Sequence, residues 1–352
     1  MAAKVAKVSA LALGLILALT ACDPPMPPEL LAEIAERTPA CVDGQTAVVL
    51  PSALDGQIDT WAEALPALCP NMTVVAATKK VLPEVVLSSV APDAKVCTPF
   101  ASAPFAMDGA ALVFFSSDFS NVNLDAKTAT AIFNGEIKNW NDPAIASLNP
   151  DSTLPNKPIS LDEKATQAQA TALSDWFSRL SGAPVNLGKL KIDNTIGGQD
   201  RLNNLAEGAI AIADASDALA ASAATVTIVT GKSLETDVVS LDSTSLASAS
   251  GQFTTTKTAT SLGLTFDAKI SPLTPKGSDT AVTPYQAVFP INMYLCGADN
   301  LKTRAFARFL LRQDTQGNIA GGSSLPLPDF IRIKAIEVVE KGLPKPSEAP
   351  AN

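Results

Sequence analysis

Blocks of hydrophobic residues along this chain have the spacing of alternating strands and helices. Apolar runs at residues 45–51 and 72–78 predict two buried strands, and the spacing of Ile58, Trp61 and Leu65 predicts a helix between them. A strand, a helix and a strand in this order predict parallel strands that are joined by a right-handed crossover. The opening of the chain therefore favours an α/β fold.

A second set of α/β elements is predicted in the sequence between the two parts of the first set. The elements predicted after the opening are strands at 110–115, 210–213, 226–229 and 287–295, and helices at 163–180, 301–310 and 331–339. The chain would leave the first α/β unit near residue 117 and return to it near residue 286. Two such crossings predict a hinge between two lobes, with a cleft for a small ligand.

These patterns give an expected organisation for the whole chain. It consists of a signal peptide at 1–22, a Pro-rich spacer at 23–44, lobe 1 at 45–117 and 286–342, lobe 2 at 118–285, and a flexible tail at 343–352. The Ser/Thr-rich stretch 241–261 shows little periodicity, and we expect it to be an irregular excursion of lobe 2.

The N-terminus has the pattern of an export signal. Lys4 and Lys7 precede an apolar core at 10–19, and the segment Leu19-Thr20-Ala21-Cys22 resembles a bacterial lipobox. A transmembrane anchor is the alternative, but the apolar run is shorter than the roughly 20 residues that span a bilayer. We therefore expect Cys22 to carry a lipid that tethers the protein to the extracytoplasmic face of the cell membrane.

Composition narrows the possible functions. Hydrophobic residues make up 47% of the 352 residues and charged residues 17%, so two cores can be filled. The net charge of −9, with no long Lys/Arg run, disfavours nucleic-acid binding.

The chain contains no histidine, which excludes His-ligated zinc sites and Ser-His or Cys-His catalysis. An enzyme would need paired carboxylates or a Ser-Lys pair, and the adjacent acidic residues Asp162 and Glu163 would point apart on a helix. We therefore expect a protein that is not an enzyme and that has no cofactor and no metal site.

Four cysteines remain after Cys22, which implies two disulfides in an exported chain. Cys41 and Cys69 precede the first and second predicted strands, and neighbouring parallel strands begin at the same edge of a sheet. Of the three possible pairings, this favours Cys41–Cys69 with Cys97–Cys296. The alternative is free or metal-binding thiols.

One stretch contains two helix boundaries within a few residues. Asn134 and Gly135 suit the left-handed end of a helix, while Asn141 or Asp142 can cap the next helix, with Pro143 at its first position. On local chemistry alone, this is a helix–turn–helix joint of any α/β domain.

The order of residues in this stretch carries a resemblance to a family. It runs Phe133-Asn134-Gly135-Glu136-Ile137, then Trp140-Asn141-Asp142-Pro143-Ala144-Ile145, then Leu148-Asn149-Pro150 and Leu154-Pro155. It resembles the second lobe of the phosphate-binding proteins of bacterial phosphate ABC transporters. The resemblance covers roughly 45–342 and is strong only at 124–155.

The resemblance implies a fold and a function. The implied fold is the α/β two-lobe type II periplasmic-binding-protein fold, in which each lobe is a central sheet flanked by helices and two crossover strands join the lobes. The implied protein is a monomer that binds a small anion, phosphate, and delivers it to an ABC permease.

The loop that would bind phosphate departs from the family pattern. The family has Arg-Ser-Asp-Gly-Ser-Gly-Thr-Thr, whereas residues 161–171 here contain no glycine, and Glu163 stands at or near the arginine position. Losing a buried charge partner costs about 3–5 kcal/mol. The stretch also suits an ordinary helix that Asp162 caps.

The residues proposed to line the cleft are therefore hydroxyls and an amide at the corresponding places: Ser52, Ser102, Thr166 and Gln167. The expected function is that of a membrane-tethered solute-binding protein of the phosphate-transport type. The alternative is the same scaffold with a lost phosphate site, binding another small ligand or a partner protein at the cell surface.

Overall fold

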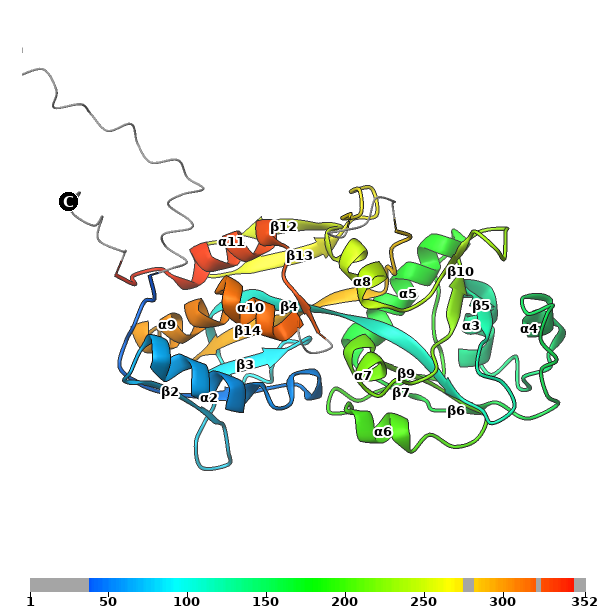
Figure 1. The fold of residues 1–352 in the computed structure, drawn as a ribbon, viewed down its shortest axis with the longest axis horizontal. Helices are drawn as coiled ribbons and strands as arrows, with labels where there is room; N and C mark the ends of the chain where they lie inside the picture. The colour runs from blue at the N-terminus through cyan, green and yellow to red at the C-terminus, as the bar shows by residue number, and fades with distance from the viewer. Residues whose placement is uncertain (1–37, 275–281, 321–323, 345–352) are drawn as a thin grey trace, which may run out of the picture. The chain divides into compact units, whose positions relative to one another are not determined.

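The computed structural model describes residues 38–274, 282–320 and 324–344 (Figure 1). The predicted signal peptide, the predicted lipidation residue Cys22 and most of the spacer lie outside the described residues, as does the tail from residue 345. None of the described helices is both long enough and apolar enough to cross a membrane.

One sheet dominates the described residues. Its strands are, in spatial order, β2 (Met72–Ala76), β1 (Gly44–Val49), β3 (Val85–Ser88), β14 (Val288–Cys296), β4 (Pro99–Phe115), β9 (Ala209–Asp214) and β6 (Ser160–Leu161), with β15 (Leu325–Pro326) also paired to β4. β1 and β2 are parallel and are joined through α2 (Gln57–Leu68), as the sequence predicts. β3 also pairs in parallel with β1 and was not predicted.

β4 is the longest strand and has different partners along its length. Residues 99–109 pair with β14, whereas Ala110–Phe115 pair with β9 (Figure 1). The sequence predicted only the second part, because Pro104 and the Asp108-Gly109 pair interrupt the apolar run. Buried side chains continue from the first part into the second, so the apolar interior is continuous along β4.

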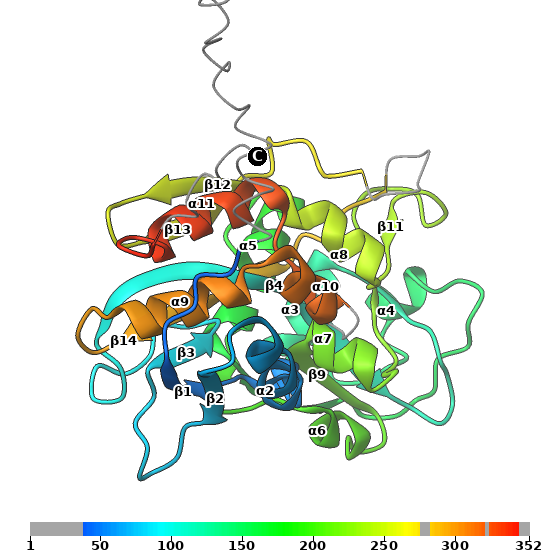
Figure 2. The same cartoon turned by 60° about the vertical axis from the view of Figure 1, so that its left-hand side comes forward.

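Helices pack around the first part of this sheet. They are α2, α9 (Leu301–Leu310), α10 (Gln313–Ala320) and α11 (Asp329–Val339). All four lie in the left-hand half of Figure 1 and are seen from another direction in Figure 2. Trp61 of α2 is fully buried, and its ring meets the edges of Phe105 and Phe306. Helix α10 was not predicted, because Gly317 lies inside it.

The second part of β4 lies in a separate group of elements. They are β5 (Asn123–Asp125), α3 (Ala126–Phe133), α4 (Pro143–Ser147), β7 (Lys164–Ala165), α5 (Gln167–Ser181), β8 (Lys191–Ile192), α6 (Gln199–Asn203), α7 (Ala215–Ala220), β10 (Thr227–Val229) and β11 (Val238–Val239).

The joint between α3 and α4 is built as the sequence predicts. Asn134 is the C-cap of α3, and Gly135 follows with a φ of 75°. Asp142 accepts the N–H of Ala144 at the start of α4. Trp140, between the helices, is fully buried and donates its indole N–H to the Gly208 carbonyl at 3.0 Å.

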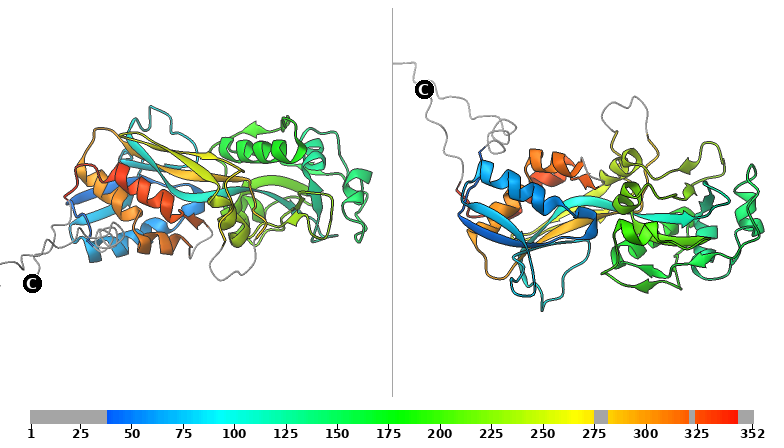
Figure 3. Two further views of the ribbon diagram at one scale, coloured as in Figure 1. Left: turned by 90° about the horizontal axis from the view of Figure 1, so that it is seen from above. Right: turned by 60° about the horizontal axis from the view of Figure 1, so that its bottom comes forward.

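The expectation of irregular structure at 241–261 is wrong. This stretch forms α8 (Ser243–Ser250) and then β12 (Phe253–Lys257), which pairs with β13 (Leu262–Phe266) in a hairpin. Apolar periodicity is weak because serines are buried in α8, where their hydroxyls bond to backbone carbonyls. The hairpin lies beside α11 (Figure 3) and contacts the first part of β4.

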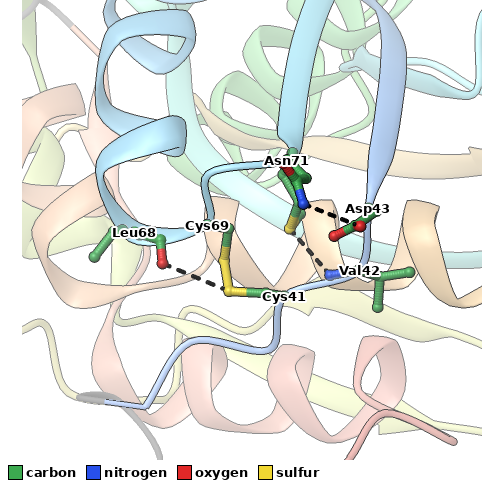
Figure 4. Close-up of a disulfide and its surroundings, with 7 residues drawn as sticks. Cys41, Val42, Asp43, Leu68, Cys69 and Asn71 are labelled. Carbon is green, nitrogen blue, oxygen red and sulfur yellow. Dashed lines mark hydrogen bonds between the residues drawn. A yellow bond between two sulfur atoms is a disulfide. The ribbon is translucent and has the colours of Figure 1, made fainter.

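Both predicted disulfides are present. Cys97–Cys296 joins the end of β14 to the segment before β4. Cys41–Cys69 joins the segment before β1 to the residue that caps α2 (Figure 4). Asn71 nearby donates to the Asp43 carboxylate at 3.1 Å, so the turn between α2 and β2 is held at two points.

Candidate functional site

The candidate site lies where the loop after β1 meets the segments around α6 and α7. This loop forms a short turn, η1 (Ser52–Leu54), which contacts α7. α7 directly follows β9, and so it begins at the carboxyl end of that strand. The site therefore joins residues from the first and the second groups of elements.

Asp217 is at the centre of this arrangement. The Ser52 hydroxyl donates to Oδ2 of Asp217 at 3.3 Å, and the Gly198 N–H donates to the same oxygen at 2.6 Å. Asp217 is only 4% exposed. One carboxylate oxygen therefore receives a donor from each of two segments that are distant in the sequence.

Two glycines allow the segment before α6 to approach so closely. Gly198 has a φ of 88°, a left-handed conformation that favours glycine. Gly197 lies against Ser52, and a Cβ at this position would collide with the Ser52 hydroxyl. Any larger residue at 197 would push the two segments apart.

A second carboxylate lies deeper, on β4. Asp108 is 3% exposed and accepts hydrogen bonds from the Gly109 N–H at 2.7 Å, the Ser216 N–H at 3.0 Å and the Ser216 hydroxyl at 2.6 Å. Burial raises the pKa of Asp108 to about 6, although these three hydrogen bonds act in the opposite direction.

A third carboxylate stands at the end of β9. Asp214 accepts the side-chain amide of Gln169 at 2.7 Å. Burial raises its pKa well above the usual value, and the negative charge of Asp108 adds to this effect. Burial also raises the pKa of Asp217, despite the hydrogen bonds from Gly198 and Ser52. The three carboxylates thus influence one another within a mostly dry environment.

Arg201 is the cation of this region. Its Nε and Nη2 donate to Oδ2 of Asp162 at 3.1 and 2.9 Å, and its Nη1 donates to the Ile212 carbonyl at 2.9 Å. It lowers the pKa of both Asp214 and Asp217. The hydrogen bonds to Asp162 and to the Ile212 carbonyl of β9 thus fix the guanidinium beside the carboxylates.

The expectation that Asp162 caps the predicted helix at 163–180 is wrong. The helix α5 begins at Gln167, because Lys164–Ala165 forms β7 instead. Thr166 is the N-cap: its hydroxyl accepts the Gln169 N–H, and the Gln169 side chain accepts the Thr166 N–H at 2.8 Å. The same Gln169 side chain reaches Asp214, so Thr166 is linked to the carboxylates through one residue.

The other two residues predicted from the sequence lie elsewhere. Ser102 is in the first part of β4, where it pairs with Tyr294 of β14, and its N–H donates to Thr260. Gln167 lines an open hollow of about 340 Å³ between α5 and the segment 186–192. Of the four predicted residues, the structure thus brings Ser52 to Asp217 and Thr166 to Gln169.

The residues that dominate the site were not predicted from the sequence: Asp108, Asp214, Asp217, Arg201 and Gly198. A signal was present for two of them. Asp108 interrupts a run of apolar residues, and Asp214 ends another, which is where a strand places functional groups. Asp217 and Arg201 carried no local signal. In the described part of the chain, no three acidic or cysteine side chains are grouped so that they could hold a metal ion.

Comparisons with known proteins agree with this architecture. A family model described as a PBP superfamily domain matches residues 52–314. A phosphate-binding protein with bound phosphate, PfluDING, superposes with a TM-score of 0.52 at 15% identity, covering 87% of this chain and all of that one. The structure of a human phosphate binding apolipoprotein superposes with a TM-score of 0.50 at 14% identity, covering 82% of this chain and 93% of that one.

The curated relatives match only part of the chain. The phosphate-binding protein PstS 3 of Mycobacterium tuberculosis is 35% identical over 89 residues, which are 25% of this chain and 23% of the relative. PstS 3 of Mycobacterium leprae is 43% identical over 60 residues, or 16% of each chain. PstS of Haemophilus influenzae is 36% identical over 61 residues, 17% of this chain and 18% of that one.

The family model covers well over half of the chain and includes every residue of the site. The fold is the two-lobe α/β fold expected from the sequence, in which β4 and β14 are the crossover strands. The chain therefore belongs to the PBP superfamily.

Proposed function

We propose that this protein is an extracytoplasmic solute-binding protein of the phosphate-transport type. In this proposal it is tethered to the outer face of the cell membrane through a lipid on Cys22, captures phosphate and delivers it to an ABC permease. The lobes are taken as residues 45–117 with 286–342, and residues 118–285. The curated relatives and structural neighbours, which are named as phosphate-binding proteins, support this function.

One observation carries the proposal. At the meeting point of two segments that are distant in the sequence, the Ser52 hydroxyl and the Gly198 N–H converge on a single anionic oxygen. Hydroxyl and backbone N–H donors are the groups with which proteins replace the hydration shell of an oxyanion. Donors arranged to hold a carboxylate oxygen can also hold a phosphate oxygen.

Ser52 is the residue that we propose to contact the ligand directly. Thr166 acts at one remove, since it orients Gln169, which binds Asp214. Arg201 lies beside the same carboxylates and supplies positive charge.

Calorimetry with inorganic phosphate at about pH 7 tests the proposal. We expect a Kd in the micromolar range or tighter, and we expect Ser52→Ala to weaken it about tenfold, because one hydrogen bond to a charged group is lost. Ser152→Ala, which removes an exposed hydroxyl far from these donors in sequence, is the matched control. No heat signal up to about 10 mM phosphate would contradict the proposal.

The alternative is that the scaffold binds another small ligand or a partner protein. The named relatives do not favour it, and a single observation does: the donors already hold the Asp217 carboxylate, whose charge also raises the pKa values of the buried Asp108 and Asp214. Negative charge at this place opposes a dianion. The alternative would gain support if phosphate failed to bind under the conditions given above.

A further inference from the structure

The carboxylate of Asp217 occupies the donors that an anionic ligand needs. Ser52 donates to Oδ2 of Asp217, and the Gly198 N–H donates to the same atom at 2.6 Å. Gly197 packs against the Ser52 side chain so closely that even a methyl group would not fit between them. The contact is therefore closed, and no ligand atom can enter it while Asp217 keeps its partners.

A carboxylate and an oxyanion are equivalent acceptors for such donors. Each needs the same hydroxyl and the same N–H, and two negative groups at one pair of donors repel each other. A ligand must therefore displace Asp217, or Asp217 must lose its charge.

We propose that Asp217 is a built-in competitor of the anionic ligand and sets the affinity and the pH range of the site. This inference rests on the proposed solute-binding function and adds to it the residue that limits anion binding. The Asp217 carboxylate bridges the loop after β1 and the segment before α6, and an incoming anion takes over the same donors.

The groups around Asp217 decide when it gives up its negative charge. Asp55, beyond η1, raises the pKa of Asp217, whereas Arg201 of α6 lowers it. Asp108 of β4 and Asp214 of β9 face it from the interior, and each has a pKa that the Asp217 charge raises in turn. Burial is the largest cause of the raised pKa of Asp217. Asp217 therefore takes up a proton at a higher pH than an exposed aspartate does.

Protonation removes the competing charge and weakens the hold of Asp217 on its donors. Anion affinity should therefore increase as the pH falls into the range in which Asp217 takes up its proton, over and above any change in the ligand itself. An asparagine at this position cannot show this dependence, because it has no charge to lose.

The test is calorimetry with inorganic phosphate on the wild type, Asp217→Asn and Asp200→Asn at several pH values in that range. Asp200 is an exposed aspartate of α6, so its replacement removes the same charge close by without touching the donors. We expect Asp217→Asn to bind phosphate about tenfold tighter or more at pH 7.5, with a flatter pH profile than the wild type. Asp200→Asn should stay within about twofold of the wild type in affinity and should keep its pH profile.

The outcomes distinguish a failure of the inference about Asp217 from a failure of the proposed function. Tight binding by the wild type together with equal or weaker binding by Asp217→Asn at all pH values would overturn the inference and leave the proposed function intact. Binding by Asp217→Asn with a silent wild type would support the inference and refute phosphate capture by the natural protein. Silence from both would refute both.

Thermal unfolding of each variant shows whether it is folded, so that a loss of the fold is not taken for a loss of binding. If Asp217→Asn does not fold, the pH profile of the wild type decides by itself when sulfate, which does not titrate in this range, replaces phosphate as the probe. An affinity for sulfate that stays constant with pH in the wild type would overturn the inference.

Discussion

Asp108 connects the longest strand of the sheet to the start of α7. Its carboxylate accepts two hydrogen bonds from Ser216 and one from Gly109, all from within the protein. Burial removes the carboxylate from water and raises its pKa to about 6, although its hydrogen bonds act in the opposite direction. The residue is thus a source of pH-dependent stability.

We expect Asp108→Asn to remove much of the pH dependence of stability between about pH 4 and pH 7. The pKa in the folded protein, about 6, lies above the usual value of 3.8. The folded state therefore binds the proton more tightly, and the wild type loses stability as the pH rises through this range. A shift of this size corresponds to about 3 kcal/mol.

Urea unfolding at several pH values measures this loss. Asp175→Asn, at an exposed position of α5, is the control and should keep the wild-type slope. Any dependence of the unfolding free energy on pH that remains in Asp108→Asn would come from Asp214 and Asp217. An unchanged slope in that variant would show that Asp108 is ionised in the folded protein at all these pH values.

The elements were predicted where periodicity and caps agree. The joint around Trp140 was predictable because Gly135, Asp142 and Pro143 each suit one backbone position only. The start of α5 was not, because Asp162 and Thr166 are both good caps, and only the pairing of β7 with β8 decides between them. Helix α8 was missed because its buried face consists largely of serines and small residues.

The two disulfides differ in the length of chain that each closes. Cys41–Cys69 joins residues 28 positions apart, whereas Cys97–Cys296 joins residues 199 positions apart. Chain entropy in the unfolded state then predicts that losing Cys97–Cys296 costs more, by about 2 kcal/mol.

Urea unfolding of the two double variants, Cys41→Ala with Cys69→Ala and Cys97→Ala with Cys296→Ala, checks this order. Alanine suits both pairs because Cys69, Cys97 and Cys296 are buried. Equal losses, or a larger loss for the short loop, would show that native packing around Cys69 outweighs chain entropy.

For the whole molecule, the two crossings between groups of elements were the main prediction from the sequence. They follow from two apolar strands far apart in the chain, which the structure pairs side by side as β4 and β14. The charge of the site was not predictable, because Asp108, Asp217 and Arg201 come from three elements and meet only in the folded protein. Only Asp108, which interrupts an apolar run, carries a local signal, and the sequence around Asp217 and Arg201 indicates no more than a short helix.

The membrane tether is a prediction at the same scale. We expect Cys22→Ser to move the protein from the membrane fraction to the soluble extracytoplasmic fraction, because the lipid would have no acceptor. Cell fractionation with detection of the protein by immunoblot measures this, and the wild type, which keeps Cys22, is the reference. Continued membrane association of the variant would indicate a different anchor.

β4 has a consequence for how fast a ligand could come and go. The strand runs from Pro99 to Phe115 without a loop, and it exchanges β14 for β9 as its partner at Gly109 and Ala110, where it passes from one group of elements to the other. Along β4, a movement of one group against the other is therefore a twist of a continuous strand. Ligand exchange would then depend on the torsional stiffness of this strand, and stiffening or softening it at Gly109 would change residence time before it changed recognition.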